Sequence, residues 1–248
     1  MTTIAIINKS SLIPDNDGAL MTKACQQQLT NHASKLLGRL PWNLLYVPKA
    51  GSIVAPADAF PLVLLDDPDH AGALGYHTED PNGRVWGRVF AKPVLSNGGT
   101  MLNGSLSVST VLSHEVLETF VDKSVNFWAD KLDGKTMIAM EIADPVENDS
   151  YTVQVSTGVL SKNVAVSVSN FVTDAWFDPQ APANARRDFM NTTPGPLMMS
   201  KGGYVVELNY TTGKVSNVFG SKEAEFMHQM KKPSHPAARS ARRAAHYS

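Results

Sequence analysis

The N-terminal part of the chain combines short apolar runs with one long segment of helical periodicity. Three runs rich in β-branched and other apolar residues predict buried strands: Thr3–Ile7, Asn43–Val47 and Phe60–Leu65. Between the first two, Ala19–Leu37 carries apolar residues close to helical spacing, and Gly38 and Pro41 follow it, as at the end of a helix. The order of these elements predicts an α/β (α+β) fold with a mixed, twisted sheet.

Arg84–Val94 is predicted to be a fourth strand, because bulky and polar residues alternate along it. Pro93 lies near its end and has no backbone N–H to donate to a neighbouring strand. We therefore expect Arg84–Val94 to be an edge strand that comes just before the next helix.

Ser107–Asp122 is the clearest helix in the sequence. Leu112, Val116 and Phe120 form an apolar stripe along it, and Ser107 or Ser109 can act as its N-cap. The other side of the helix carries Val111, His114, Glu115, Glu118 and Asp122. Because the helix is otherwise apolar, we expect this polar side to lie on a buried element.

The second half of the chain is predicted to be irregular and rich in strands. Tyr151–Val155 and Val164–Val172 are strand candidates, and Gly203–Asn209 is expected to form a hairpin with Lys214–Phe219. We expect one domain over residues 1–230, with a weak subdivision near residue 135. Residues 231–248 hold five Lys or Arg and no Asp or Glu, which predicts a flexible basic tail.

Composition narrows the chemistry that the chain can perform. The formal net charge of −1 gives no overall field that favours nucleic acid or a membrane. The single cysteine, Cys25, excludes an intramolecular disulfide and a cysteine-based zinc site, so any metal must be held by His, Asp and Glu. The start of the chain lacks the basic region of a signal peptide, and no segment approaches the roughly 18 apolar residues that span a bilayer. We expect a protein made in the cytoplasm, with release or association with a virion left open.

His114 and Glu118 stand four residues apart on the predicted helix, so their side chains share one face and can converge on a single cation. Glu115 follows His114 as in a His-Glu-x-x-His motif, where this Glu is the general base on a metal-activated water. Here Glu118 replaces the second His, which gives His-Glu-x-x-Glu. Zinc accepts carboxylate oxygen and is the first expectation. The added negative charge weakens the ion as a Lewis acid, and the oxygen-rich set also suits Mn²⁺, Mg²⁺ or Ca²⁺.

A third metal ligand has to come from outside the helix. Asp122 lies on the same face but about 12 Å along the axis from His114, which is too far for one ion. It is expected to orient a ligand or to contact the following linker. Met140–Glu147 places three carboxylates beside an apolar run, a density that requires cations or solvent. Glu141 is the first candidate for the third ligand and Asp144 the second.

Over roughly residues 3–177, the order of elements resembles the zincin fold of metallopeptidases. Several segments are similar to an uncharacterised zincin-like group from bacterial and phage genomes: Gly75–His77, Val89–Phe90, Ser113–Glu118 and Glu141–Glu147. The resemblance implies that Arg84–Val94 takes the place of the edge strand that pairs with an extended peptide. It also implies that His114 and Glu118 are metal ligands and that Glu115 is the catalytic base. The chain departs from the family at Glu118, where the family has His.

The leading hypothesis is therefore a metal-dependent hydrolase that cleaves a peptide bond, with the substrate along Arg84–Val94 by strand addition. His77 precedes the predicted edge strand, where it is either a second catalytic residue that lies at the rim of a cleft and stabilises an oxyanion, or a structural or surface histidine. The alternative is a catalytically inactive metal-binding structural protein, such as a phage virion or assembly component. The basic tail is either a solvated segment or a contact for an anionic partner, and no membrane partner is expected.

Overall fold

The computed structural model describes residues 2–69, 73–158 and 162–225. Its largest sheet has five strands in the order β2-β1-β3-β5-β4. Four of them run parallel to their neighbours, and the last is antiparallel: β1 (Thr3–Asn8), β2 (Asn43–Val47), β3 (Phe60–Leu65), β5 (Val85–Phe90) and antiparallel β4 (Gly75–Glu79). The predicted α/β class is confirmed, and the three N-terminal strands lie where the apolar runs predict them.

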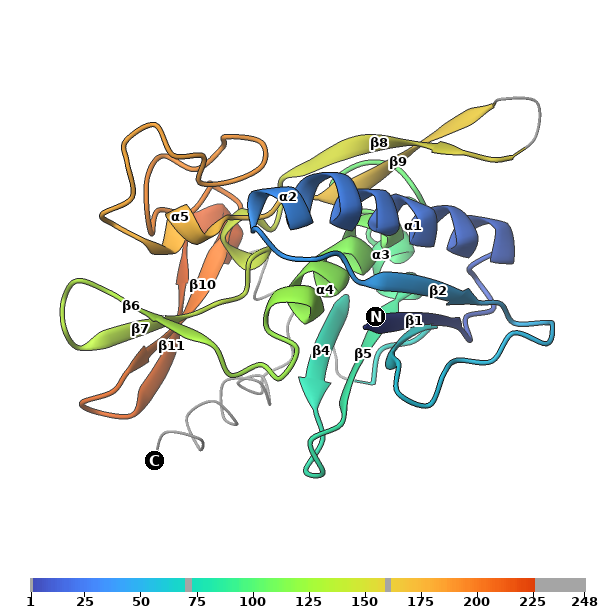
Figure 1. Ribbon diagram of the computed structural model, residues 1–248, viewed down its shortest axis with the longest axis horizontal. Coiled ribbons are helices and arrows are strands. Elements are labelled where there is room, and N and C mark those ends of the chain that lie inside the picture. The colour runs from blue at the N-terminus through green and yellow to red at the C-terminus, as the bar shows by residue number, and fades with distance from the viewer. Residues whose placement is uncertain (1, 70–72, 159–161, 226–248) are drawn as a thin grey trace.

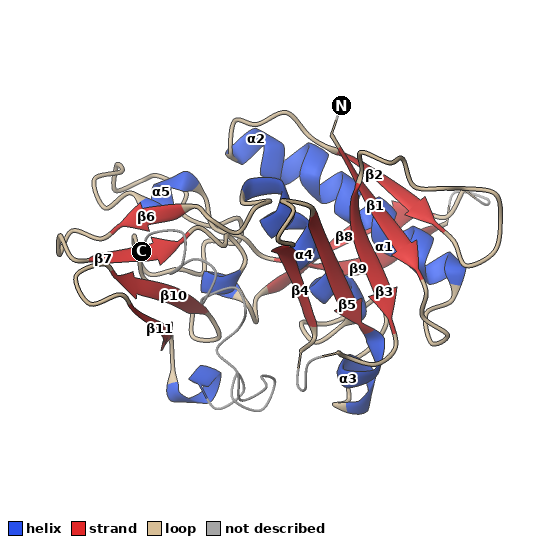
Figure 2. Ribbon diagram, turned by 90° about the horizontal axis from the view of Figure 1, so that it is seen from below, coloured by secondary structure: helices blue, strands red, loops and turns tan. Residues whose placement is uncertain are grey.

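Two long helical elements cover one face of this sheet, as Figure 2 shows. The first joins α1 (Asp15–Gln28), a π-helical turn (Leu29–Ala33) and α2 (Ser34–Leu36), and the second is α4 (Val108–Val121). α1 packs against β1 and β2, whereas α4 packs against β4 and β5. The predicted helices are confirmed, although α1 begins at Asp15 rather than Ala19.

A hairpin closes the helical layer from the other side, so that the helices lie between two layers of strands (Figure 1). It consists of β8 (Ser150–Ser156) and β9 (Asn163–Ser169). Gln28 of α1 donates a hydrogen bond from Nε2 to the carbonyl of Ser169 at 2.7 Å, and the Ser169 backbone N–H donates to Ser113 Oγ of α4 at 2.7 Å. These buried hydrogen bonds fix the position of α4 within its layer.

A second sheet, in the order β11-β10-β7-β6, lies beside the three layers (Figure 1). Its strands are β6 (Trp128–Asp130), β7 (Thr136–Ala139), β10 (Tyr204–Asn209) and β11 (Lys214–Phe219). The predicted hairpin is confirmed by the pairing of β10 with β11. One apolar cluster extends from the three layers to the second sheet and includes Ile4, Val116, Ile138, Trp176 and Val205. The short helices are α3 (Ala91–Ser96), α5 (Asp174–Phe177) and the 3₁₀ turn η2 (Asp144–Val146).

The prediction that Arg84–Val94 forms an edge strand is wrong. β5 covers only Val85–Phe90 and is hydrogen-bonded on both sides, to β3 and to β4. Pro93 belongs to the first turn of α3, where its missing N–H costs no hydrogen bond. The edge strand beside β5 is instead β4, while β2 forms the opposite edge; the apolar pattern does not predict β4 because His77 is its only buried residue.

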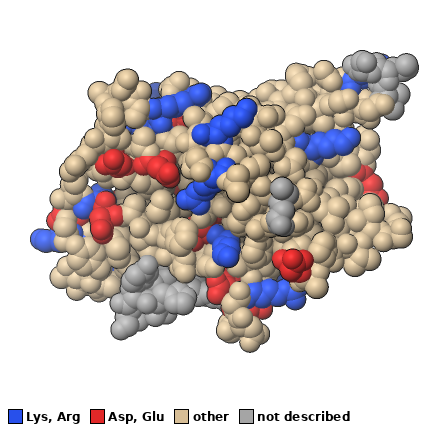
Figure 3. Space-filling model, in the orientation of Figure 1, with Lys and Arg blue, Asp and Glu red and all other residues tan. Residues whose placement is uncertain are grey.

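The surface and the end of the chain add two further observations. On the face shown in Figure 3, basic and acidic side chains are both present and neither sign covers the face. The predicted basic tail, residues 231–248, lies outside the described residues. Within the described ranges, no helix has both the length and the apolar character needed to cross a bilayer.

Candidate metal centre

Helix α4 carries three of the side chains that form the centre. Its N-cap is Ser107, whose extended backbone (φ −142°, ψ 156°) lets Oγ accept a hydrogen bond from the Thr110 backbone N–H at 3.2 Å. From this start the helical repeat places His114 and Glu118 one turn apart on one face, with Glu115 next to them. Glu115 and Glu118 are buried, so two carboxylates lie inside an otherwise apolar helix.

Strand β4 brings His77 against this helix. Side chains two residues apart point to the same face of a strand, so His77 faces the same way as Gly75. A Cβ atom on Gly75 would lie 2.8 Å from Val111 Cγ1 and 3.0 Å from Glu115 Oε1. The missing side chain at Gly75 therefore lets β4 approach α4 closely enough for the His77 ring to reach the two glutamates.

The 3₁₀ turn η2 supplies the last member of the centre, Asp144. The turn is held by a hydrogen bond from the Ser200 backbone N–H to the Pro145 carbonyl at 3.0 Å. Gly203, just before β10, lies so close to the Pro145 carbonyl that any Cβ there would overlap it. The second sheet thus holds the turn from behind, and the Asp144 side chain is buried against α4.

The first candidate group consists of His114, Glu118 and Asp144, whose ligand atoms all lie within 4.8 Å of one another. His114 Nε2 is 3.0 Å from Glu118 Oε1 and 3.3 Å from Asp144 Oδ1. Two ligands of one tetrahedral zinc ion, each bound at about 2.0–2.1 Å, are separated by about 3.3 Å. The two separations from His114 Nε2 are close to this value, so the group could hold a single divalent ion.

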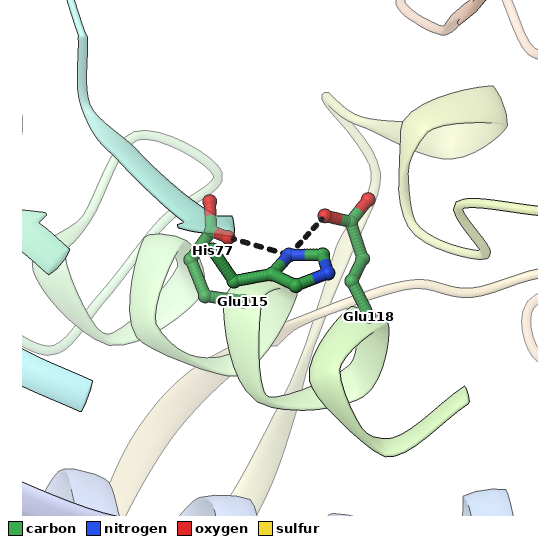
Figure 4. A group of neighbouring side chains, drawn as sticks. All are labelled: His77, Glu115 and Glu118. Atoms are coloured by element: carbon green, nitrogen blue, oxygen red, sulfur yellow. Dashed lines mark ion pairs between the residues drawn. The ribbon is translucent and has the colours of Figure 1, made fainter. Parts of the chain in front are cut away.

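The second candidate group consists of His77, Glu115 and Glu118 and is buried throughout. Figure 4 shows one oxygen of each glutamate directed at the same nitrogen of His77. His77 Nδ1 is 3.5 Å from Glu115 Oε2 and 3.5 Å from Glu118 Oε2. This buried group could also hold a metal ion, and it shares Glu118 with the first group.

The backbone carbonyl of Asp122 determines which ring nitrogen of the neutral His77 carries the proton. His77 Nε2 lies 3.0 Å from the Asp122 carbonyl oxygen, which can only accept a hydrogen bond. Nε2 therefore carries the proton, and in the neutral ring the lone pair is on Nδ1, which faces the glutamates. A histidine that binds a metal commonly donates its second N–H to a backbone carbonyl in this way. The Asp122 carboxylate accepts from the backbone N–H groups of Asn126 and Phe127, so the predicted contact with the linker is present.

The electrostatics of the first group favour a cation. Burial alone would lower the pKa of His114, but the negative charges of Glu118, Asp144 and Glu115 raise it well above its usual range. Asp144 Oδ1 lies 3.3 Å from His114 Nε2, so a protonated His114 ring can donate to this buried carboxylate. The buried carboxylates of Glu118 and Asp144 need a positive charge beside them, which is either the proton on His114 or a bound cation that takes its place.

The structure places the predicted site residues as follows. His114, Glu118 and Asp144 come together, and Glu115 lies beside them in contact distance of His77. Glu141, the first candidate for the third ligand, is buried but belongs to neither group of the described residues. The downstream carboxylate that reaches α4 is Asp144, in the turn η2, at 3.3 Å from His114 Nε2. The expected rim position of His77 is also wrong, because this residue is 1% exposed and its Nε2–H is bonded to Asp122.

Comparisons with known proteins add no functional information to this geometry. No protein family matches the chain, and no curated protein or solved structure matches it either.

Proposed function

We propose that this protein is a metal-dependent hydrolase of the zincin type that cleaves peptide bonds. The observation that carries the proposal is the His114–Glu118–Asp144 group, with two buried carboxylates, a partly exposed His114 and ligand-like separations, next to the Glu115 carboxylate. The order of elements up to α4 also supports it, since an antiparallel outermost strand, β4, lies against the helix that carries the motif. A peptide substrate is proposed to lie beside β4, in place of the Arg84–Val94 strand expected from the sequence.

The residues fit a divalent ion, with His114, Glu118 and Asp144 as its ligands. When bound, such an ion polarises a carbonyl group and lowers the pKa of a nearby water molecule. One imidazole and two carboxylates fit zinc, and the two carboxylates also keep manganese as a candidate.

Glu115 is the proposed general base. It takes a proton from the water molecule whose oxygen attacks the carbonyl carbon of the substrate. The C–N bond then breaks, and Glu115 returns the proton to the departing nitrogen. The products are a carboxylic acid and an amine, and the acid then gives its proton, the second from the attacking water, to the amine, which leaves a carboxylate and an ammonium group.

His77 acts as a positioning residue in this proposal. Its Nδ1 is 3.5 Å from Glu115 Oε2, and its Nε2 is bonded to the Asp122 carbonyl. When Nδ1 carries a proton, it pairs with Glu115 and keeps the base directed toward the site. The hydrogen bond to Asp122 replaces the oxyanion role expected for His77, because that N–H is already used.

The test compares Glu115→Gln with the parent chain. Metal content is measured by elemental analysis, and cleavage is measured with a library of internally quenched peptides. We expect the variant to bind metal but to lose cleavage by at least about 100-fold. Glu207→Gln is the matched control, because Glu207 is paired with Lys131 on the second sheet.

Cleavage that persists in Glu115→Gln would exclude the mechanism. Metal binding without any cleavage by the parent chain would leave the ion a structural role, which is the alternative considered for the sequence.

A further inference from the structure

Glu118 takes part in both candidate groups through different oxygen atoms. Its Oε1 lies 3.0 Å from His114 Nε2, and its Oε2 lies 3.5 Å from His77 Nδ1. The two histidines belong to different elements, α4 and β4, so they approach the carboxylate separately. This is the arrangement of a carboxylate that bridges two cations, as found in two-metal sites with ions about 3.5–4 Å apart.

The His77 group has the features of a ligand set in its own right. The hydrogen bond from Nε2 to the Asp122 carbonyl leaves the Nδ1 lone pair facing Glu115 and Glu118. One nitrogen and two carboxylate oxygens therefore converge on one point (Figure 4). A positive charge must lie between these donors, and it is either a proton on Nδ1 or a divalent cation that takes the place of that proton.

We propose that His77, Glu115 and Glu118 form a second divalent-cation site next to the His114–Glu118–Asp144 site, with Glu118 as the bridge. The second ion binds more weakly than the first, by at least about tenfold, because two like charges on one carboxylate repel each other.

The second site regulates activity, a consequence that rests on the proposed function. Glu115 is the general base there, and a cation bound to its carboxylate withdraws the lone pair that would accept the proton. The first equivalent of metal therefore activates the protein, and excess metal inhibits it. The chain would respond to the concentration of free metal through the residue that performs the chemistry.

Binding is measured first, without any substrate. The full-length chain is freed of metal by dialysis against a chelator and titrated with Zn²⁺ in a calorimeter. We expect two binding events in the parent chain and a single one in His77→Ala, in accordance with the two groups. His32→Ala is the matched control and keeps both events, since His32 contacts Tyr151 and Phe189 away from both groups.

A second measurement needs no variant and so does not depend on the folding of His77→Ala. Two Mn²⁺ ions that share a carboxylate give a spin-coupled electron paramagnetic resonance spectrum, whereas isolated ions do not. Saturation of the parent chain by one ion, or an uncoupled Mn²⁺ spectrum at saturation, would overturn the proposal.

The inhibition is tested by the ratio of peptide cleavage at high and at low Zn²⁺, determined for each protein against its own maximum. In the parent chain, cleavage at high Zn²⁺ is expected to be lower than cleavage at low Zn²⁺ by about tenfold or more. In His77→Ala the two rates should be nearly equal. Two bound ions without any cleavage would support the second site and reject the proposed function. Cleavage by a chain that binds a single ion at every Zn²⁺ concentration would support the proposed function and reject the second site.

Discussion

His114 Nε2 lies 3.0 Å from Glu118 Oε1, one helical turn further along α4, and the carboxylate is fully buried. Glu118→Ala removes an oxygen from each of the two candidate groups, so it is the single change that affects metal binding most. We expect metal affinity to fall by at least about 100-fold, which exceeds the usual effect of changing a residue that only supports a ligand. Isothermal titration with Zn²⁺ measures it. An unchanged affinity would remove α4 from the metal centre.

Metal removal is expected to destabilise the protein. An ion at a free concentration about 100 times its Kd stabilises the folded state by about 2.7 kcal/mol. For a chain of this size, that corresponds to a decrease in Tm of roughly 5–11 °C when a chelator is added. Differential scanning calorimetry with and without the chelator measures this change. His114→Ala should respond less than the parent chain, because only the weaker His77 group would then bind metal, and a full response in that variant would contradict the assignment.

The local part of the centre could be predicted from the sequence, because a spacing of four residues on a helix fixes the relation of His114 to Glu118. The third ligand could not be predicted in the same way. Both Glu141 and Asp144 follow an apolar run, and only the turn at Asp144, held by Gly203 and Ser200, decides which carboxylate faces α4.

The strands show the same division between local and tertiary information. β1 and β3 are apolar runs covered by other elements, and their composition identifies them. β4 has one buried residue, His77, and its strand conformation depends on pairing with β5, which the sequence of β4 itself does not encode. For this reason the alternation of bulky and polar residues predicts that Arg84–Val94, which contains β5, is the edge strand.

Gly75 is expected to be essential for the close approach of β4 to α4. Gly75→Ala places a methyl group 2.8 Å from Val111 Cγ1 and 3.2 Å from the Arg88 carbonyl, so strand and helix must separate. We expect a loss of about 1–3 kcal/mol in unfolding free energy, together with weaker binding at the His77 group. Chemical denaturation and metal titration measure the two effects.

The control for this substitution is Gly195→Ala. Its added methyl group meets only the flexible Met198 side chain, with Sδ at 3.3 Å. The unfolding free energy should stay within about 1 kcal/mol of the parent value. Equal losses in both variants would show that the effect at Gly75 is not specific to the contact with α4.

Asp188 is expected to make stability depend on pH in the acidic range. Burial by itself raises the pKa of Asp188, but the hydrogen bonds that it accepts, among them those from Asn170 Nδ2 and Thr193 Oγ1, lower the pKa below its usual value. A carboxyl group with a lowered pKa in the folded state stabilises the protein above its unfolded pKa of about 3.9. This contribution is lost as the pH falls from there through the folded value.

Asp188→Asn tests this explanation. The carboxylate accepts hydrogen bonds at both oxygens, whereas the amide has an NH₂ group in place of one oxygen and cannot accept a hydrogen bond there. We expect the variant to be less stable than the parent by about 1–3 kcal/mol at neutral pH. The difference should shrink below about pH 4, where the parent carboxylate becomes protonated. Chemical denaturation across a pH series measures it. Asp178→Asn, at an exposed position of the same region, should differ from the parent by no more than about 0.5 kcal/mol at every pH. A difference for Asp188→Asn that stays constant down to the acid limit would show that shape, not charge, is what Asp188 contributes.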